Sequence, residues 1–201
     1  MLQGVWLFIL NNWIELFGSI SGLIYIIFSY RHSIWLWPIG IATSAAYIIV
    51  FYDTALYADM LLQVYYLFVS IYGWLHWIFG KQVNKTTHKL KICRLKPYQW
   101  FISITITGTL TLFYLPFGQY FNASFPLVDG FITAGSIVAT WMLTRKIVEQ
   151  WIFWVILDAT SVVLMIAKDK YPTAILMTIY TILAVAGYFK WLKDYKLQDN
   201  D

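Results

Sequence analysis

The sequence predicts an all-α polytopic membrane protein with seven transmembrane helices. Three observations lead to this fold class: 60% of the 201 residues are hydrophobic and 12% are charged, the apolar residues form seven long runs, and the basic residues gather in alternate loops. Soluble domains carry about 25% charged residues, so this chain has too little polar surface to cover a globule of its size. A helix that crosses the hydrocarbon core needs about 20 mostly apolar residues, which sets the expected length of each run.

The seven apolar runs follow one another through short polar connections, except in one place. They cover residues 13–28, 34–51, 56–78, 98–117, 126–143, 147–167 and 172–191. Pro38 falls in the opening turn of the second helix, where a missing N–H costs little. Residues 81–96 form a long basic connection that divides the chain in two. Residues 2–10 are too few to span and are expected to be interfacial or to extend the first helix, and the tail 199–201 is expected to be loose.

The distribution of basic residues supports this number of helices. With seven helices, twelve of the 14 Lys and Arg residues fall on one side of the membrane, and only Lys168 and Lys170 fall on the other. If the fourth run did not span, the split would be nine to five. Because cytoplasmic loops are rich in Lys and Arg, the count favours seven helices with the N-terminus outside and the C-terminus in the cytoplasm.

A self-match at a spacing of 114 residues predicts two copies of a three-helix unit. The matched pairs include Phe17 and Phe131, Arg31 and Arg145, Trp37 and Trp151, Gly73 and Gly187, and Trp77 and Trp191. Some matches are expected by chance in so apolar a chain, but the Arg after the first helix and the Gly near the end of the third recur at equivalent places. We therefore expect one membrane domain in a 3+1+3 arrangement, in which residues 13–79 and 126–191 are parallel repeats and residues 98–117 are the linker helix. Parallel repeats occur in transporters, with the binding site near the bilayer midplane.

One carboxylate lies within the sixth predicted helix. Trp151, Trp154 and Asp158 are spaced i, i+3 and i+7, so at about 100° per residue they share one helix face. Two indole rings beside a buried anion suit a flat cationic ligand, because the rings offer π-faces and the carboxylate offsets the charge. The alternative is that the Trp residues are packing or interface anchors and that Asp158 is a structural hydrogen-bond partner.

Other polar groups within the predicted helices are candidates for the same site. At the 114-residue spacing Asp158 meets Ser44, so the first repeat would supply small residues and the hydroxyls of Thr43 and Ser44. Gly40 is expected only to allow close helix packing. Gln63, in the third helix, would either line the cavity or bridge helices, because a buried amide needs hydrogen-bond partners.

Several acidic residues are predicted to lie towards the outer side of the membrane. They are Glu15, Asp53, Asp59 and Asp129. They would either form an anionic vestibule that concentrates a cation, or be ordinary interface charge partly cancelled by Lys168 and Lys170.

The sequence carries no signature of an enzyme, a cofactor or a metal site. It has no nucleophile elbow, no glycine-rich phosphate loop and no paired His for zinc, and its single cysteine, Cys93, excludes an intrachain disulfide. The basic residues gather in loops, so nucleic acid is not an expected partner. Two rivals to a transporter remain: a membrane scaffold or receptor, and a membrane-embedded enzyme. The enzyme would need a second acid, base or metal ligand near Asp158.

The sequence around the sixth predicted helix resembles the PnuC family of vitamin transporters. The similar residues are Leu143-Thr144-Arg145-Lys146, Val148-Glu149, Trp151, Trp154 and Asp158. Further similarity lies in Trp13-Ile14-Glu15, in residues 56–64 and in Tyr72-Gly73-Trp74. The resemblance therefore covers nearly the whole chain, from about residue 13 to residue 191.

This resemblance implies a seven-helix, SWEET-like 3+1+3 fold and facilitated diffusion across the bacterial inner membrane. The implied substrate is nicotinamide riboside, and phosphorylation by a cytoplasmic kinase would make its uptake one-way. Trp151, Trp154 and the residue at position 158 would bind the substrate, and Gln63 matches a polar position of the third helix.

Asp158 departs from the pattern of the nicotinamide riboside branch, which usually has Asn there. A related branch transports thiamine, and both ligands carry a cationic aromatic ring that the two Trp residues would suit. A carboxylate binds a cation better than an amide does, but it costs more to hold away from water. Nicotinamide riboside is the first expectation and thiamine the alternative, while ion coupling and a homo-oligomer are left open.

Overall fold

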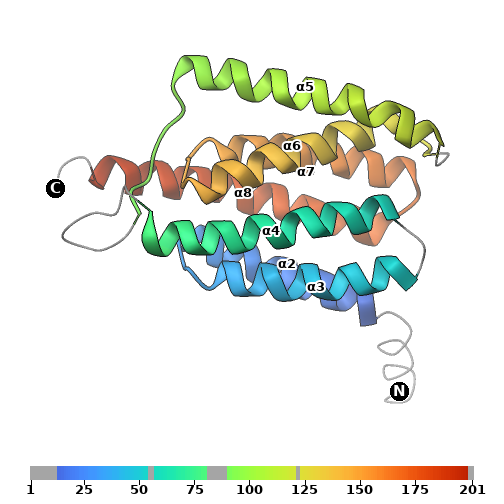
Figure 1. Cartoon of the computed structure of the whole chain (residues 1–201), viewed down its shortest axis with the longest axis horizontal. Coiled ribbons are helices and arrows are strands. Elements are labelled where there is room, and N and C mark those ends of the chain that lie inside the picture. Colours follow the sequence, from blue (N-terminus) through green and yellow to red (C-terminus); the bar gives the residue numbers. More distant parts are fainter. Residues whose placement is uncertain (1–12, 54–56, 81–89, 121–122, 199–201) are drawn as a thin grey trace. The chain divides into compact units, whose positions relative to one another are not determined.

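The computed structural model describes residues 13–53, 57–80, 90–120 and 123–198 of the chain. These residues form seven α-helices, which Figure 1 shows in chain order. They are α2 (Trp13–Tyr30), α3 (Leu36–Asp53), α4 (Tyr57–Phe79), α5 (Pro97–Tyr120), α6 (Pro126–Thr144), α7 (Gln150–Ala167) and α8 (Tyr171–Gln198). The expectations for residues 2–10 and 199–201 lie outside the described residues.

Six of the described helices are long and apolar enough to cross a membrane, and α2 adds a shorter apolar stretch, Phe17–Tyr30. The predicted fold class, an all-α membrane protein with seven helices, is confirmed. Several predicted bounds need correction. Helices α3 and α7 begin later than predicted, at Leu36 and Gln150, and α8 continues to Gln198. Helices α2, α3 and α5 end two or three residues later than predicted, at Tyr30, Asp53 and Tyr120. Hydropathy marks where a chain is apolar, but the apolar residues before α3 and α7 belong to turns.

The helix bounds repeat at the spacing found in the sequence. Helix α3 covers residues 36–53 and α7 covers residues 150–167, so both bounds differ by 114 residues. Helices α2 and α6 end at residues 30 and 144, and α4 and α8 begin at residues 57 and 171, again 114 residues apart. On this correspondence we propose that residues 13–79 and 126–191 are the two repeats and that residues 98–117 belong to the helix between them.

The turn between the first and second helix of each repeat has the same conformation. His32 and Lys146, at equivalent positions, both have φ of 52°, which reverses the chain after the helix. The backbone hydrogen bonds Ser33 N to Phe28 O and Ile147 N to Met142 O correspond as well. Two different sequences that share an arginine, Arg31 and Arg145, therefore form the same turn.

Residues up to Ser70 form one compact unit, in which α2 packs on α3. A Cβ atom built on Gly40 would lie 2.9 Å from Ser70 Oγ and 3.2 Å from Tyr25 Cε2. Gly40 thus allows close contact between neighbouring helices, as the sequence predicted.

The second unit begins at Ile71 and contains the end of α4 and helices α5 to α8. Within it α7 packs on α8 and on α6, and α5 packs on α6. Its buried core cluster comes from α6 and α7 and consists of Val138, Ala139, Met142, Phe153 and Leu157. The buried hydroxyls of Ser103, Thr107 and Thr111 on α5 each donate to the carbonyl four residues earlier, so this polar stripe is satisfied within its own helix.

The close contact at Gly40 gives a test of the helix packing in the first unit. Gly40→Ala is expected to destabilise the protein by about 1–3 kcal/mol, because the added methyl group meets Ser70 and Tyr25 in a packed interior. Gly108→Ala is the matched control, since a Cβ there meets no atom within 4 Å, and this variant should be neutral or stabilising by up to about 1 kcal/mol. Thermal unfolding in detergent compares the two. Equal melting temperatures would contradict the packing assigned to Gly40.

Candidate functional site

The three residues predicted to form the site lie on α7 within the second unit. Asp158 is 7% exposed, Trp151 is 1% exposed, and Trp154 is half-buried and packs against the core cluster. No hydrogen bond or ion pair joins the carboxylate of Asp158 to another of the described residues. A buried carboxylate is costly unless it is paired. Contacts in the described part of the chain therefore do not explain why this acid is held inside a helix bundle.

Trp151 is held in place by α8. A Cβ atom built on Gly187 would lie 2.7 Å from three atoms of the Trp151 ring, so the indole packs directly against the backbone there. The Trp191 ring meets it edge-on, with centroids 5.8 Å apart and planes at 79°. One face of Trp151 is thus covered in this conformation, and the half-buried Trp154 is the more accessible ring of the pair.

Gly187 is a residue whose role sequence reasoning did not assign. The repeat pairs it with Gly73, and this pairing was the available signal for a position that cannot hold a side chain. The structure gives the reason, which is that any larger residue would displace Trp151.

The remaining predicted site residues lie in the first unit. Ser44 is buried and Thr43 half-buried on α3, and Gln63 is half-buried on α4. That these three side chains meet the α7 face stays a prediction.

Gln150 is the polar residue that the sequence analysis missed. It is the first residue of α7, it is 0% exposed, and neither Oε1 nor Nε2 has a hydrogen-bond partner within the described ranges. The indole N–H of Trp151, the next residue, is also buried without such a partner. The spacing of four residues from Gln150 to Trp154 and on to Asp158 was the signal that could have found it.

The connection between α4 and α5 is attached to the start of α7 through Glu149. Arg94 Nε donates to Glu149 Oε1 at 2.7 Å, and the backbone N–H of Leu95 donates to Oε2 at 2.9 Å. Glu149 is 1% exposed, so both carboxylate oxygens are used in a buried setting. The hydrogen bond to Glu149 raises the pKa of Arg94, which keeps the guanidinium charged at any working pH.

Backbone atoms of the same connection form hydrogen bonds with two other parts of the chain. Cys93 donates to Lys146 O at 3.0 Å and accepts from Val148 N at 3.0 Å. One residue earlier, Ile92 N donates to Gln198 Oε1 at 2.9 Å, and Gln198 Nε2 donates back to Ile92 O at 3.2 Å. We call residues 92–95 the linker clamp, since they join the α6–α7 turn to the end of α8.

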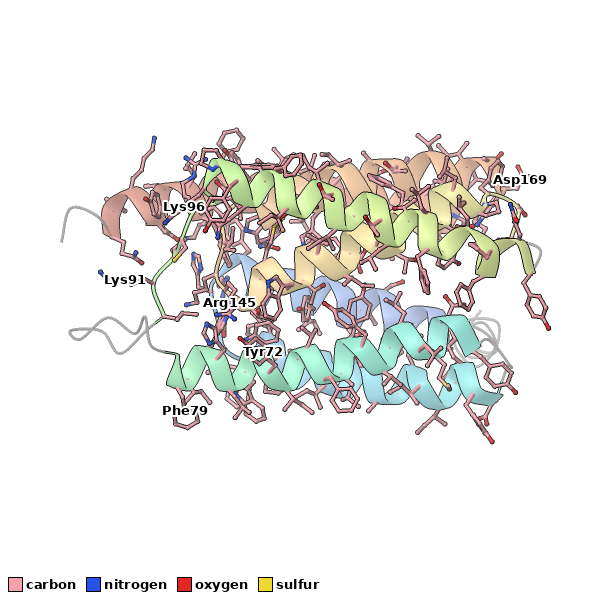
Figure 2. The ribbon with its side chains drawn as sticks, turned by 45° about the horizontal axis from the view of Figure 1, so that its top comes forward. Tyr72, Phe79, Lys91, Lys96, Arg145 and Asp169 are labelled. Carbon is pink, nitrogen blue, oxygen red and sulfur yellow. The ribbon has the colours of Figure 1, made fainter. Side chains whose placement is uncertain are left out.

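Basic side chains beside this turn rest on aromatic rings. Figure 2 labels Arg145 and Tyr72. The Arg145 guanidinium carbon lies 4.8 Å from the centroid of Trp141 and 5.7 Å from that of Tyr72, and these two rings stack with centroids 5.5 Å apart. Lys146 Nζ lies 4.2 Å from the centroid of Trp77. Such cation–π contacts allow charge to be held at the edge of an apolar bundle.

At the other end of α6 and α7, Lys168 Nζ lies 3.0 Å from Asp129 Oδ1. This ion pair supports the second interpretation of Asp129, ordinary interface charge that a lysine cancels. Among the residues that the structure describes, no group of three His, Cys, Asp or Glu side chains could hold a metal ion.

The fold and the polar groups within its spanning helices define a multi-pass membrane protein of the transporter class. Comparison with known proteins gives the family. The chain belongs to the nicotinamide mononucleotide transporter family, whose sequence model matches residues 12–193. It is therefore a transporter rather than an enzyme, and membership argues against a scaffold or receptor.

Individual relatives agree with this assignment. The nicotinamide riboside transporter PnuC of Escherichia coli (strain K12) is 29% identical, covering 90% of this chain and 85% of the relative. The riboflavin/roseoflavin transporter RibM of Streptomyces davaonensis is 28% identical over 89% of this chain and 84% of the relative. A crystal structure of the vitamin B3 transporter PnuC is similar in fold, with a TM-score of 0.75, 23% identity, and coverage of 96% of this chain and 86% of that chain.

The linker clamp gives a prediction that the chain's single cysteine can report. Burial raises the pKa of the Cys93 thiol, so at a given pH less of it is the reactive thiolate, and alkylation of the folded protein is slow. Glu149→Gln weakens the charge-assisted hydrogen bond to Arg94 by about 1.5–3 kcal/mol and is expected to speed alkylation of Cys93 by maleimide.

Lys190→Gln is the control, because it breaks a partly exposed i,i+4 ion pair with Asp194 worth only about 0.3–0.5 kcal/mol. This variant should leave the alkylation rate unchanged. If Cys93 reacts at the wild-type rate in Glu149→Gln, the clamp does not depend on that carboxylate.

Proposed function

We propose that this protein moves nicotinamide riboside across the bacterial inner membrane by facilitated diffusion. The single observation that carries the proposal is the buried carboxylate of Asp158, which has no hydrogen bond or ion pair among the described residues and shares a helix face with Trp154. A permanently cationic pyridinium ring would supply the missing counter-charge. The family and the name of the Escherichia coli relative support this choice of substrate.

The chemistry of binding follows from the residues of α7. The cationic ring lies against the face of Trp154, where a desolvated cation–π contact is worth about 2 kcal/mol. Asp158 offsets the charge, and at an effective dielectric constant of about 20 two unit charges 4 Å apart attract by about 4 kcal/mol. That Thr43, Ser44 and Gln63 bind the polar part of the substrate stays a prediction from the sequence.

The direction of net uptake is set by a reaction outside the transporter. The sorting of the basic residues supports an orientation with the N-terminus outside and the C-terminus in the cytoplasm. A cytoplasmic kinase then phosphorylates the arriving substrate, and the added charge of about −1.5 to −2 converts a cation into an anion that the Asp158 carboxylate repels. The protein itself needs only to equilibrate its substrate.

Thiamine is the second candidate, and the observation that favours it is the full carboxylate at position 158. A carboxylate suits any permanently cationic aromatic ring, and thiamine carries one. Riboflavin, named for the Streptomyces relative, has no cationic ring and could offer Asp158 only hydrogen-bond donors, not a counter-charge. Uptake of labelled nicotinamide riboside, thiamine and riboflavin into proteoliposomes separates the three, and failure of all three to enter would remove the proposal.

Substitution of the acid tests the charge. Asp158→Ala is expected to lower uptake by 100-fold or more, since an unbalanced cation in the bundle costs roughly 3 kcal/mol, and Asp158→Asn should retain part of the activity. Asp169→Asn makes the same chemical change on an exposed acid after α7 and should transport normally. Unimpaired transport by Asp158→Ala would show that the carboxylate does not bind the substrate.

The aromatic contact is tested separately. Trp154→Ala is expected to weaken binding about 30-fold, which corresponds to loss of a desolvated cation–π contact, and Trp154→Phe should keep part of it. Isothermal titration of detergent-solubilised protein measures both. Equal affinities for the Ala and Phe variants would mean that the ring face is not used.

A further inference from the structure

We propose that Gln150 is a further substrate-binding residue, whose carboxamide holds an uncharged hydrogen-bonding group of the substrate and so sets selectivity. The inference rests on the proposed function, because it extends the Asp158 site by two helical turns. It assigns a role to a residue that neither the sequence motif nor the charge argument had used.

The burial of Gln150 calls for an explanation. Its side chain is 0% exposed, and both the donor Nε2 and the acceptor Oε1 have no hydrogen-bond partner in the described chain. A buried amide without partners destabilises the state that contains it, and native proteins contain few of them. Such a group suits a site that a ligand completes.

The first repeat shows that the architecture does not need an amide at this position. Its equivalent, Leu36, is the first residue of α3 and is also 0% exposed. The backbone hydrogen bond Leu36 N to Ser33 O corresponds to Gln150 N to Ile147 O, so the local geometry is shared. Leucine fulfils the packing role there, and the polar atoms of Gln150 must serve something else.

Three positions of one helix face are polar or aromatic on α7 and differ from their equivalents on α3. Gln150, Trp154 and Asp158 follow one another at intervals of four residues, about 6 Å along the helix axis at each step. Their equivalents on α3 are Leu36, Gly40 and Ser44. By contrast, the pairs Trp37 and Trp151, Gly73 and Gly187, and Trp77 and Trp191 are identical and fit a shared architectural role. Substrate recognition is therefore expected where the repeats diverge, and Gln150 belongs to that set.

The chemistry of the end of this face is neutral and rich in donors. A carboxamide offers two N–H donors and one carbonyl acceptor, and the unpartnered Trp151 Nε1 adds another donor beside it. The neighbouring acid, Glu149, is already engaged by Arg94 and Leu95. With the cationic ring at Trp154 and Asp158, an uncharged group with donors and acceptors fits at Gln150, either the ribose hydroxyls or the ring carboxamide.

Replacement of Gln150 by the residue of the other repeat separates a ligand contact from a structural one. Gln150→Leu is expected to raise the melting temperature without ligand, by about 2 °C or more, because it removes two unsatisfied atoms. It should also weaken nicotinamide riboside binding about tenfold. Gln150→Met, which keeps the length of the side chain, serves as a second variant in case the branched Leu does not fit.

Gln198→Leu is the matched control, since that amide is hydrogen-bonded at both ends to Ile92. It should lower the melting temperature and leave the ratio of affinities between ligands unchanged. Two analogues identify the group that Gln150 holds: 1-methylnicotinamide keeps the carboxamide without the ribose, and nicotinic acid riboside keeps the ribose without the carboxamide. If Gln150→Leu lowers the affinity for the ribosides only, Gln150 contacts the ribose hydroxyls. If it also lowers the affinity for 1-methylnicotinamide, Gln150 contacts the ring carboxamide.

Two results overturn the inference alone, and a third removes the proposed function as well. If Gln150→Leu binds nicotinamide riboside as the wild type does while Asp158→Asn binds it poorly, Gln150 is not part of the site and the proposed function stands. A lower melting temperature in both Gln150 variants with unchanged affinity would assign the amide to a structural water. If the wild-type protein binds none of these ligands, the proposed function fails, and the inference fails with it.

Discussion

The lack of water inside a bilayer is the constraint on which this structure depends, because each polar group there needs a partner within the protein. The buried hydroxyls of α5, α6 and α7 meet this requirement by donating to carbonyls of their own helices. Three groups on α7 do not meet it among the described residues: the amide of Gln150, the indole N–H of Trp151 and the carboxylate of Asp158. Because these three groups lie on one helix, packing among the described residues does not explain why α7 carries them.

The two proposed repeats would explain how one helix can hold three unpartnered polar groups while the fold is kept. They share a turn with φ of 52° at His32 and Lys146, and their second helices have bounds 114 residues apart. A duplicated scaffold needs its turns and its large packing residues in both copies, which accounts for the paired Trp and Gly positions. On one face, α7 carries a ring, an amide and an acid where α3 has smaller or apolar residues.

Much of the fold and part of the candidate site were predictable from the sequence, for physical reasons. Seven helices were predicted from hydropathy and charge, because a membrane-spanning helix needs a long apolar run and because lysines are concentrated in the cytoplasmic loops. The face of Trp154 and Asp158 followed from helical periodicity alone. The starts of α3 and α7 were predicted too early, because apolar residues in a turn read as helix. The spacing of Gln150 from Trp154 was visible in the sequence, but its burial was not predictable, since a glutamine at a helix start ordinarily faces solvent and its burial depends on tertiary packing. The contact of Arg94 with Glu149, 55 residues away, was equally invisible to local patterns.

Charge balance connects the scaffold to the proposed transport activity. An empty site with a carboxylate in low dielectric carries an uncompensated charge, and a cationic substrate removes that penalty as it binds. The affinity would then come largely from removal of the free-energy cost of the unpaired buried carboxylate. Only a ligand with a positive charge would remove that cost. On the proposed function, a neutral flavin brings no such charge, and the phosphate of a phosphorylated product opposes its binding. An asparagine at this position would lower the free-energy cost of the site without ligand, and it would also lower the affinity for a cation. Asp158 would therefore select permanently charged rings more strictly than an amide would.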